Sequence, residues 1–288
     1  MADTTMKPPE QMLREASRWW TTSIIDIEPG RIYVRGYPIQ QLIGELGFAE
    51  MVWLMLRGDL PDRGRAALLE AAMVAGVDHG PHAPSIAISR MAVTCGLPLN
   101  GAMASAINVL DDVHGGAGQQ CMALYARIDA IAGGGQATLA HVEQGLDEFA
   151  AVHGKIIPGF GHRFHDVDPR TQPLMMLARA AQAEGLLHGR HVAMAELIAR
   201  TLTARKGRPI PMNIDGATAV IYSELGFSPE LGRGLFILSR SVGILAHAWE
   251  QKQQGGRIKG PMPPAIPYSY TGPATRTLDR QAHHATST

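Results

Sequence analysis

The sequence is poor in the features that mark several classes of protein. Its 288 residues include only two cysteines, Cys95 and Cys121, which argues against a disulfide framework or a structural zinc site and is typical of a reducing compartment. Lysine plus arginine and aspartate plus glutamate both number 26, so net charge gives no case for nucleic acid or an anionic membrane as partner. The first residues lack a basic and then apolar secretion signal, and no apolar run reaches membrane-spanning length. We therefore expect a cytoplasmic protein.

What is present is the pattern of a helical globular protein. Hydrophobic residues make up 45% and charged residues 18% of the chain, and the length allows two lobes. β-Branched residues on both sides of Glu28-Pro29-Gly30 predict one short hairpin over 22–27 and 31–35. Apolar residues elsewhere recur every three or four positions, so the fold class is all-α. The predicted helices cover about 39–56, 61–77, 85–94, 101–112, 119–131, 136–153, 172–184, 190–205, 217–225 and 228–252.

Residues 158–170 form the stretch around which the chain is organised. They begin with Pro158-Gly159-Phe160-Gly161-His162-Arg163 and end with Asp168-Pro169-Arg170. The prolines and glycines predict a loop that a ligand can approach closely. A histidine can move a proton near neutral pH, and arginines suit carboxylates or phosphates. Such a loop is fitted to hold an anion beside a histidine, although a Gly-x-Gly next to a histidine also occurs by chance.

A metal site is the alternative for this loop, because His162, His165 and Asp168 are spaced by three. Helical ligand spacing means little in a loop bounded by prolines and glycines. We therefore predict no metal.

Four other positions could take part in catalysis or binding. For His79, His114 and Asp215, a purely structural role is the alternative. His79 lies in a break at 78–84, which is otherwise a surface turn. His114 precedes Gly115-Gly116 at a helix start, where a ring can meet an anion or simply cap the helix. Asp215 is the only acid between Glu196 and Glu224 and is alternatively an N-cap.

Arg240 is the only charged residue between Arg233 and Glu250 in an apolar helix, and it requires an anionic partner from the protein or from a ligand. The proline-rich stretch beyond it, from Pro261 to Pro273, predicts an extended arm.

Five stretches together resemble the citrate synthase superfamily along most of the chain. They occur in that family's order and rough spacing: residues 35–39 after the hairpin, 114–117, 158–170, 213–216 and 235–240. The chain is shorter than most citrate synthases. Asp78-His79-Gly80-Pro81, residues 238–243 and residues 268–270 are closer to citryl-CoA lyase and to the citryl-CoA lyase module of ATP-citrate lyase, whereas His114 follows the citrate synthase pattern.

The resemblance implies a homodimer, or a larger assembly, of subunits with two helical domains. A large domain would comprise 1–116 and 221–288, and a small domain 117–220. The two would close over coenzyme A, as substrate or product thioester, and a tricarboxylate.

The resemblance also implies a role for each motif residue. Asp215 would be the base that forms the acetyl-CoA enol and the acid that reprotonates it, and His114 would donate to the thioester oxygen. His162 would bind the oxaloacetate carbonyl or the citryl hydroxyl, and either His162 or His79 would accept the hydroxyl proton in cleavage. Arg170 and Arg240 would bind substrate carboxylates through bidentate contacts, each with two nitrogens. The residues expected to contact CoA are Pro158, Gly159, Phe160, Gly161 and Arg163.

The sequence departs from the family near its end. The family places an arginine before a proline there, supplied by the neighbouring subunit. This chain has Arg257-Ile258-Lys259-Gly260-Pro261, so Arg257 or Lys259 would have to substitute, or the substrate would differ in a carboxylate.

Three functions are consistent with these residues. The first is a lyase that cleaves citryl-CoA to acetyl-CoA and oxaloacetate. The second is a citrate or 2-methylcitrate synthase that condenses an acyl-CoA with oxaloacetate. The third is a non-catalytic acyl-CoA-binding paralogue, which the presence of His114, His162, Asp215, Arg170 and Arg240 argues against.

Overall fold

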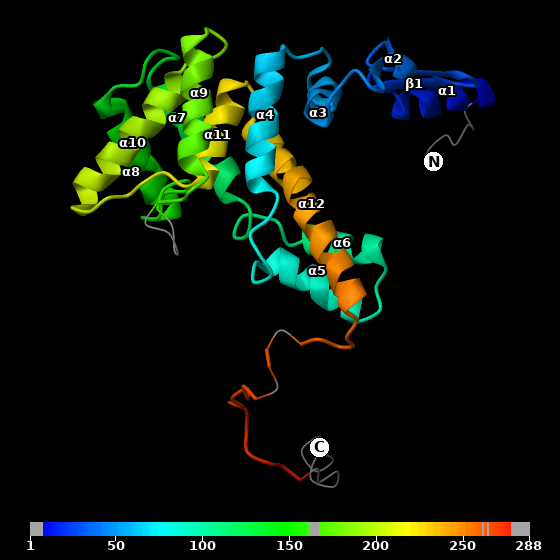
Figure 1. Cartoon of the computed structure of the whole chain (residues 1–288), viewed down its shortest axis with the longest axis vertical. Coiled ribbons are helices and arrows are strands. Elements are labelled where there is room, and N and C mark those ends of the chain that lie inside the picture. Colours follow the sequence, from blue (N-terminus) through cyan, green and yellow to red (C-terminus); the bar gives the residue numbers. More distant parts are fainter. Residues whose placement is uncertain (1–7, 162–166, 261, 264, 278–288) are drawn as a thin grey trace, which may run out of the picture.

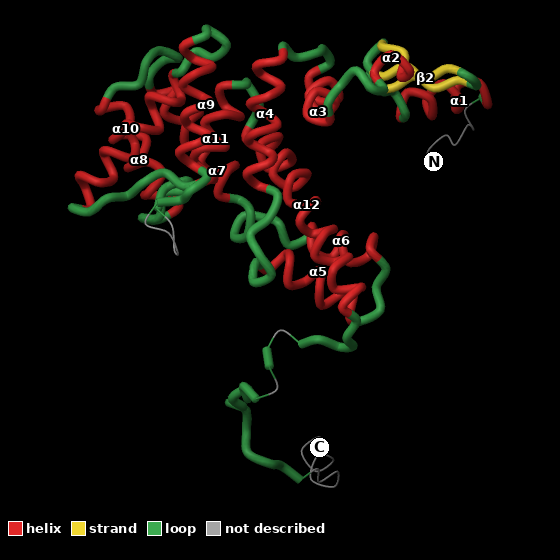
Figure 2. Tube along the Cα trace, viewed as in Figure 1, coloured by secondary structure: helices red, strands yellow, loops and turns green. Residues whose placement is uncertain are grey.

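The structure is a computed structural model that describes residues 8–161, 167–260, 262–263 and 265–277. It confirms the all-α class with a small sheet near the N-terminus (Figure 2). The helices are α1 (Pro9–Trp19), α2 (Ile39–Leu42), α3 (Phe48–Arg57), α4 (Arg63–Gly76), α5 (Pro84–Thr94), α6 (Leu99–Ile107), α7 (Ala117–Ile131), α8 (Leu139–His153), α9 (Thr171–Ala183), α10 (Arg190–Lys206), α11 (Ile214–Glu224) and α12 (Pro229–Gln254). The strands are β1 (Ile25–Glu28), β2 (Arg31–Val34) and β3 (Tyr37–Pro38).

The predicted hairpin is the first part of a three-stranded antiparallel sheet in the order β1-β2-β3. Ile25 pairs with Val34 and Glu28 with Arg31 across the turn. β1 is exposed along its whole length. Val34 alone among the strand residues is buried, and it packs with Leu42 and Leu54 in a small cluster. The sheet therefore attaches to the body through one side of β2.

Helices α7–α11 gather into one block, and the long helix α12 runs from this block to α5 and α6 (Figure 1). One hydrophobic cluster contains side chains of α3, α4 and α7–α12, with the fully buried Leu69, Tyr125, Ile198 and Ile221 among them. A smaller cluster around Ile86 and Ile244 joins α5, α6 and α12.

The division into domains stays a prediction. The main cluster contains residues from both predicted domains, such as Leu69 and Ile198. The predicted boundary after 220 falls inside α11, which continues to Glu224.

Beyond α12 the chain leaves the body as the extended arm that its prolines predict (Figures 1 and 2). The arm is tied to α5 at its start, where Ile258 N–H donates to Thr94 O at 3.0 Å and Lys259 N–H to Thr94 Oγ1 at 2.9 Å. Within the described ranges, no helix combines the length and apolar character needed to cross a bilayer.

Of the helix ends that differ from the prediction, two lie next to candidate site residues. The helix expected to run to Asp112 ends at Ile107, because Asp111 N–H donates to His114 O at 2.9 Å and closes a tight loop. The helix expected from 217 begins at Ile214. Both differences change how a candidate site residue is held.

Candidate active site

The described start of the central loop pairs with the segment that precedes α11. Gly161 N–H donates to Pro211 O at 2.7 Å, and Asn213 N–H donates to Gly159 O at 3.0 Å. The Asn213 side-chain N–H donates to Gly161 O at 2.6 Å. This pairing brings two stretches fifty residues apart in sequence together at the N-terminus of α11.

Glycine is required at the contact point between loop and helix. A Cβ at Gly159, where φ is +84°, would lie 2.6 Å from Cys121 Sγ and 2.9 Å from Gly216 Cα. A Cβ at Gly216 would lie 2.4 Å from Gly159 O. The loop and α11 are therefore in backbone-to-backbone contact, which a side chain at either position would separate.

Asp215 is not the N-cap of α11. This excludes the structural alternative for Asp215 and leaves its carboxylate available for acid–base chemistry. Asn213 is the N-cap, and its Oδ1 accepts from the N–H groups of Asp215 at 3.0 Å and Gly216 at 3.3 Å. Among the described residues, no donor reaches the Asp215 carboxylate. That carboxylate lies over the first turn of α7, 3.9 Å from where a Cβ of Gly118 would be.

The electrostatic environment keeps Asp215 easier to protonate than an ordinary aspartate. Burial raises its pKa, the positive charges of Arg170 and Arg240 lower it, and Asp168 raises it again. The net direction is upward because burial is the largest effect. A carboxyl group with a raised pKa holds a proton more readily than an ordinary aspartate, so it can serve as an acid as well as a base.

Asp168 holds Arg170 in place beside Asp215. The Nε and Nη2 of Arg170 donate to the two Asp168 oxygens at 2.9 and 2.8 Å, and Ile214 N–H donates to Asp168 Oδ2 at 3.2 Å. Burial raises the pKa of Asp168, but the hydrogen bonds and charge of Arg170 and the Ile214 N–H together lower it to about 2. The carboxylate is therefore ionised at neutral pH.

This ion pair limits what Arg170 can offer a substrate. The sequence prediction gave Arg170 a two-nitrogen contact with a substrate carboxylate, but Nε and Nη2 already bind Asp168. Nη1 is left without a partner among the described residues. Asp168 also belonged to the metal alternative, and its oxygens are engaged with Arg170; His162 and His165 lie outside the described residues.

His114 is held at the N-terminus of α5. Ser85 N–H donates to His114 Nε2 at 3.1 Å, and Ser85 Oγ lies 3.0 Å from the same nitrogen. A backbone N–H can only donate, so Nε2 is unprotonated and Nδ1 carries the hydrogen. Burial, with the charges of Arg240 and His79, lowers the pKa of His114. The ring is therefore neutral, with Nδ1–H as a donor.

Arg240 is buried without a charged partner. Its Nε donates to Gly76 O at 3.1 Å, and its guanidinium carbon lies 4.9 Å from the centre of the Phe236 ring. Across the described part of the chain it makes no ion pair. Burial lowers its pKa, whereas the charges of Asp78 and Asp215 raise it. The anionic partner expected from the sequence is thus not supplied by an adjacent side chain, and a substrate carboxylate fits this position.

The structure brings most of the predicted residues together. Arg240 interacts electrostatically with both Asp215 and His114, and His114 also with His79. A Cβ at Gly115, next to His114, would lie 2.9 Å from the Phe236 ring on which Arg240 stacks. His162 and Arg163 lie outside the described residues, so their predicted roles stay predictions.

Arg257 and Lys259 lie at the far end of α12 in this chain. Lys259 Nζ is 3.4 Å from Gln251 Oε1, and Gln251 follows Arg240 by eleven residues, about 16 Å along a helix. Arg257 is exposed. A contribution of either residue to the site would have to come from a neighbouring subunit, as the resemblance implies.

The predicted CoA contacts of the loop stay a prediction, and the structure gives its residues a packing role. Phe160 is buried in the main cluster and Pro158 is buried beside it. The Gly161 N–H is used by Pro211. The backbone groups that remain for a ligand are therefore fewer than the sequence prediction assumed.

Sequence reasoning missed the residues that hold the others in place. These residues are Asn213, Ser85 and Asp78. They hydrogen-bond Asp215 N–H, His114 and His247, and only the fold shows the last two contacts. Asp168 was considered only as a metal ligand, although its position two residues before Arg170 is a signal for an ion pair. His247 shares one face of α12 with Arg240, at a spacing of seven, and this spacing was the available signal for it.

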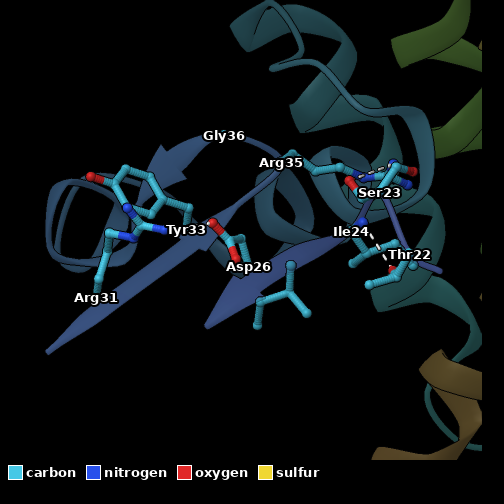
Figure 3. A pocket seen from close by; sticks show the side chains of 9 residues that line it. Thr22, Ser23, Ile24, Asp26, Arg31, Tyr33, Arg35 and Gly36 are labelled. Atoms are coloured by element: carbon cyan, nitrogen blue, oxygen red, sulfur yellow. Dashed lines mark hydrogen bonds and ion pairs between the residues drawn. The ribbon is translucent and has the colours of Figure 1, made fainter. Parts of the chain in front are cut away.

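Two cavities lie away from these residues. One, of about 440 Å³, is bounded by Thr22–Asp26, by Arg31 and Tyr33 of β2, and by Arg35 in the turn after β2 (Figure 3). The other, of about 330 Å³, is an apolar groove between α3 and α12. Neither is lined by a residue predicted for the site.

Comparisons with known proteins agree with the fold and the motif order. Citrate synthase from Acidithiobacillus ferridurans is 29% identical over 223 residues, which are 75% of this chain and 54% of that protein. ATP-citrate synthase subunit 1 from Sordaria macrospora is 25% identical over 256 residues, 81% of this chain and 35% of that protein. The chain thus spans about half the length of the citrate synthase it matches.

One solved structure is similar to this chain along almost its own full length. Citryl-CoA lyase from Hydrogenobacter thermophilus is 32% identical with a TM-score of 0.80, over 92% of this chain and 99% of that one. Citrate synthase from Thermoplasma acidophilum, solved with carboxymethyl coenzyme A and oxaloacetate, is 23% identical with a TM-score of 0.65, over 82% and 60%, and supports the fold alone. Residues 61–262 match the citrate synthase C-terminal domain. Because this match covers well over half of the sequence, the chain belongs to the citrate synthase family.

Proposed function

We propose that the protein is a carbon–carbon lyase that cleaves citryl-CoA to acetyl-CoA and oxaloacetate. The observation that carries the proposal is the likeness to a citryl-CoA lyase, which is 32% identical with a TM-score of 0.80 over 99% of that protein's length. Three citrate synthase structures are less similar, with identities of 18–23% and TM-scores of 0.58–0.65. A half-buried carboxyl group with a raised pKa, lying between two arginines, supports acid–base chemistry at the site.

Cleavage needs one proton removed and one delivered. The citryl hydroxyl loses its proton to His162 or His79, its oxygen becomes the oxaloacetate carbonyl, and the bond to the thioester CH₂ breaks. The released electron pair forms the enolate of acetyl-CoA, with its negative charge on the thioester oxygen. Protonated Asp215 then gives its proton to the CH₂ carbon, and acetyl-CoA leaves. No water is consumed, and no metal takes part in these steps.

The remaining groups stabilise charge. His114 donates Nδ1–H to the thioester oxygen, where negative charge develops, and its neutral form prevents it from protonating that oxygen outright. Arg240 binds a substrate carboxylate, because its guanidinium otherwise lacks an ion pair among the described side chains. Arg170 contributes Nη1, with Asp168 holding the rest of its guanidinium.

The second candidate is a citrate or 2-methylcitrate synthase, which the named relatives favour. The same groups would act in reverse, with Asp215 as the base, followed by hydrolysis of the thioester. The discriminating experiment incubates the protein first with citryl-CoA, and then with acetyl-CoA or propionyl-CoA plus oxaloacetate.

Release of oxaloacetate from citryl-CoA, with little free CoA from the condensation mixtures, is the expected result. Rapid release of CoA in the condensation mixtures would instead support the synthase. A non-catalytic paralogue would turn over none of the mixtures. If turnover is seen, Asp215→Ala should abolish it; a variant that keeps full turnover would contradict the acid–base role.

A further inference from the structure

Helices α4 and α12 cross at positions where only small residues fit. A Cβ at Gly243 would lie 2.2 Å from Val77 O, and a Cβ at Gly76 would lie 2.9 Å from Ser239 Oγ. The close crossing places the turn after α4 directly on α12. Asp78, the second residue of this turn, has its Oδ1 only 3.0 Å from where a Gly243 Cβ would be.

His247 lies one turn beyond Gly243 on the same face of α12 and reaches Asp78. Its Nε2 is 3.2 Å from Asp78 Oδ2. On its other side, Arg90 Nη1 of α5 is 3.2 Å from Nδ1. A guanidinium has donors and no acceptor, so Nδ1 must accept and Nε2 must carry the hydrogen that Asp78 accepts. The contacts therefore specify one tautomer, with the hydrogen on Nε2.

Other groups fix Arg90 in turn. Its Nη1 donates to Glu250 Oε2 at 2.6 Å, and its Nη2 donates to Gln254 Oε1 at 2.7 Å. Glu250 Oε2 also lies 4.0 Å from His247 Nδ1. The charged groups that face His247 are thus Arg90 from α5, Asp78 from the turn, and Glu250 from its own helix.

Asp78 connects this chain of contacts to the site. Its Oδ2 also accepts from Gly80 N–H at 3.1 Å. Burial raises the pKa of Asp78, but hydrogen bonds from His247, Gly80 and His79 lower it, and the net direction is downward. The ionised carboxylate acts on Arg240 and favours the charged guanidinium. The next residue is His79, which interacts electrostatically with His114.

We propose that His247 is a positioning residue: with Arg90 behind it, it holds Asp78 so that His79 faces the site and Arg240 has a nearby negative charge. This role rests on the proposed function, because it serves the reaction through His79 and Arg240. The partners of His247, which are Asp78, Arg90 and Glu250, are not among the residues assigned to touch the substrate.

The activity test uses three variants in the full-length protein. His247→Leu removes the donor to Asp78, and we expect kcat for citryl-CoA cleavage to fall about 30-fold, less than the loss of an acid–base group itself. His247→Gln keeps an amide N–H near the Nε2 position and should recover kcat to within about threefold. Asp78→Asn should lower kcat at least as far as His247→Leu, because it also removes the negative charge near Arg240. The double variant should be no slower than Asp78→Asn alone, because the His247–Asp78 interaction is already lost in that variant.

His191 offers a matched control. It is a buried histidine between carboxylates, 2.9 Å from Asp129 Oδ2 and 3.4 Å from Glu224 Oε1, in the α7–α11 block. His191→Gln should lower the melting temperature without changing kcat. If His247→Leu likewise lowers only the melting temperature, or if its effect multiplies with that of Asp78→Asn, the positioning role is wrong.

A measurement without turnover separates this inference from the proposed function. Nitrogen-15 NMR of the full-length protein should find His247 neutral with hydrogen on Nε2, and the His79 ring signals should move in His247→Leu but not in His191→Gln. A doubly protonated His247, or unmoved His79 signals, would overturn the inference. If the unaltered protein turns over none of the CoA mixtures, the proposed function fails, and the NMR result still decides the positioning role.

Discussion

The two sides of the candidate site are built in different ways. The aspartate side, formed by Gly159, Asp168, Arg170 and Asp215, lies on the main hydrophobic cluster and is fixed by backbone pairing and by glycines without space for a Cβ. The histidine side, formed by His79, His114, Arg240 and His247, lies over the small α5–α6–α12 cluster and is fixed by side-chain hydrogen bonds.

The two sides should therefore respond differently to amino-acid substitutions. On the aspartate side, packing determines geometry, so substitutions there should act first on folding. On the histidine side, donors and charges determine geometry, so substitutions should act first on the reaction. Asp215 is the exception. It belongs to the aspartate side, but it is the reacting group, so its substitution should act first on the reaction.

The largest effect should follow replacement of Asp215. Asp215→Asn removes the proton donor, and kcat should fall about 10²–10⁴-fold. The pKa of Asp215 is raised, so cleavage by the unaltered enzyme, which needs the protonated form, should slow as pH rises through that pKa. Condensation, which needs the carboxylate, should show the opposite slope. A pH series of both reactions measures this.

The stability of the same variant separates chemistry from folding. A carboxyl group with a raised pKa costs stability above its ordinary titration range, because the folded state resists its ionisation. Asp215→Asn removes this cost, so it should melt at neutral pH at least as high as the unaltered protein. A lower melting temperature would mean that Asp215 is a structural carboxylate.

The second effect tests the histidine side. His114→Gln removes the Nδ1–H donor, and by analogy with other oxyanion donors kcat should fall about 10²-fold. The melting temperature should change little, because the ring is only half-buried. His188→Gln, at an exposed position, is the control and should leave kcat unchanged. Equal kcat values in the two variants would remove His114 from the mechanism.

The sequence predicted the helices well because apolar spacing and Pro-Gly breaks are local signals. α3 ends at Arg57, one residue beyond the predicted end at 56, because the next residue, Gly58, takes a φ of +93° that favours glycine. The start of α11 was misplaced because Asn213 and Asp215 are both good caps. Only the hydrogen bonds of the folded chain select Asn213.

The sequence predicted which residues form the site, but not the contacts that hold them in place. Asp215, Arg240 and His114 were expected to act together, and the structure brings both Asp215 and His114 within electrostatic range of Arg240. The contact of His247 with Asp78 spans 169 positions. No local pattern specifies such a contact, since it depends on how closely α4 and α12 cross.

The third effect measures packing on the aspartate side. Gly159→Ala places a Cβ 2.6 Å from Cys121 Sγ at a φ of +84°, and should cost about 3 kcal/mol of unfolding free energy from strain and overpacking together. Gly161→Ala is the matched control: its φ is +77°, with nothing within 4 Å of the added Cβ, so it should cost only about 1–2 kcal/mol. Equal costs in urea unfolding would show that backbone strain alone, not contact with α11, demands glycine.

The smallest effect concerns Asp168, whose pKa of about 2 lies below its ordinary value of 3.8. A lowered pKa contributes stability above the ordinary value and loses it as pH falls through the folded-state value. The contribution is roughly 2 kcal/mol, present above about pH 4 and lost toward pH 2. Urea unfolding at several pH values should therefore find Asp168→Asn less stable than the unaltered protein at pH 7, with the stability difference closing toward pH 2.

Asp147→Asn is the control. It breaks an exposed ion pair with Arg205 and should cost less than about 1 kcal/mol of unfolding free energy. A gap for Asp168→Asn that does not depend on pH would mean that the fit of the side chain, and not its charge, holds Arg170 beside Asp215.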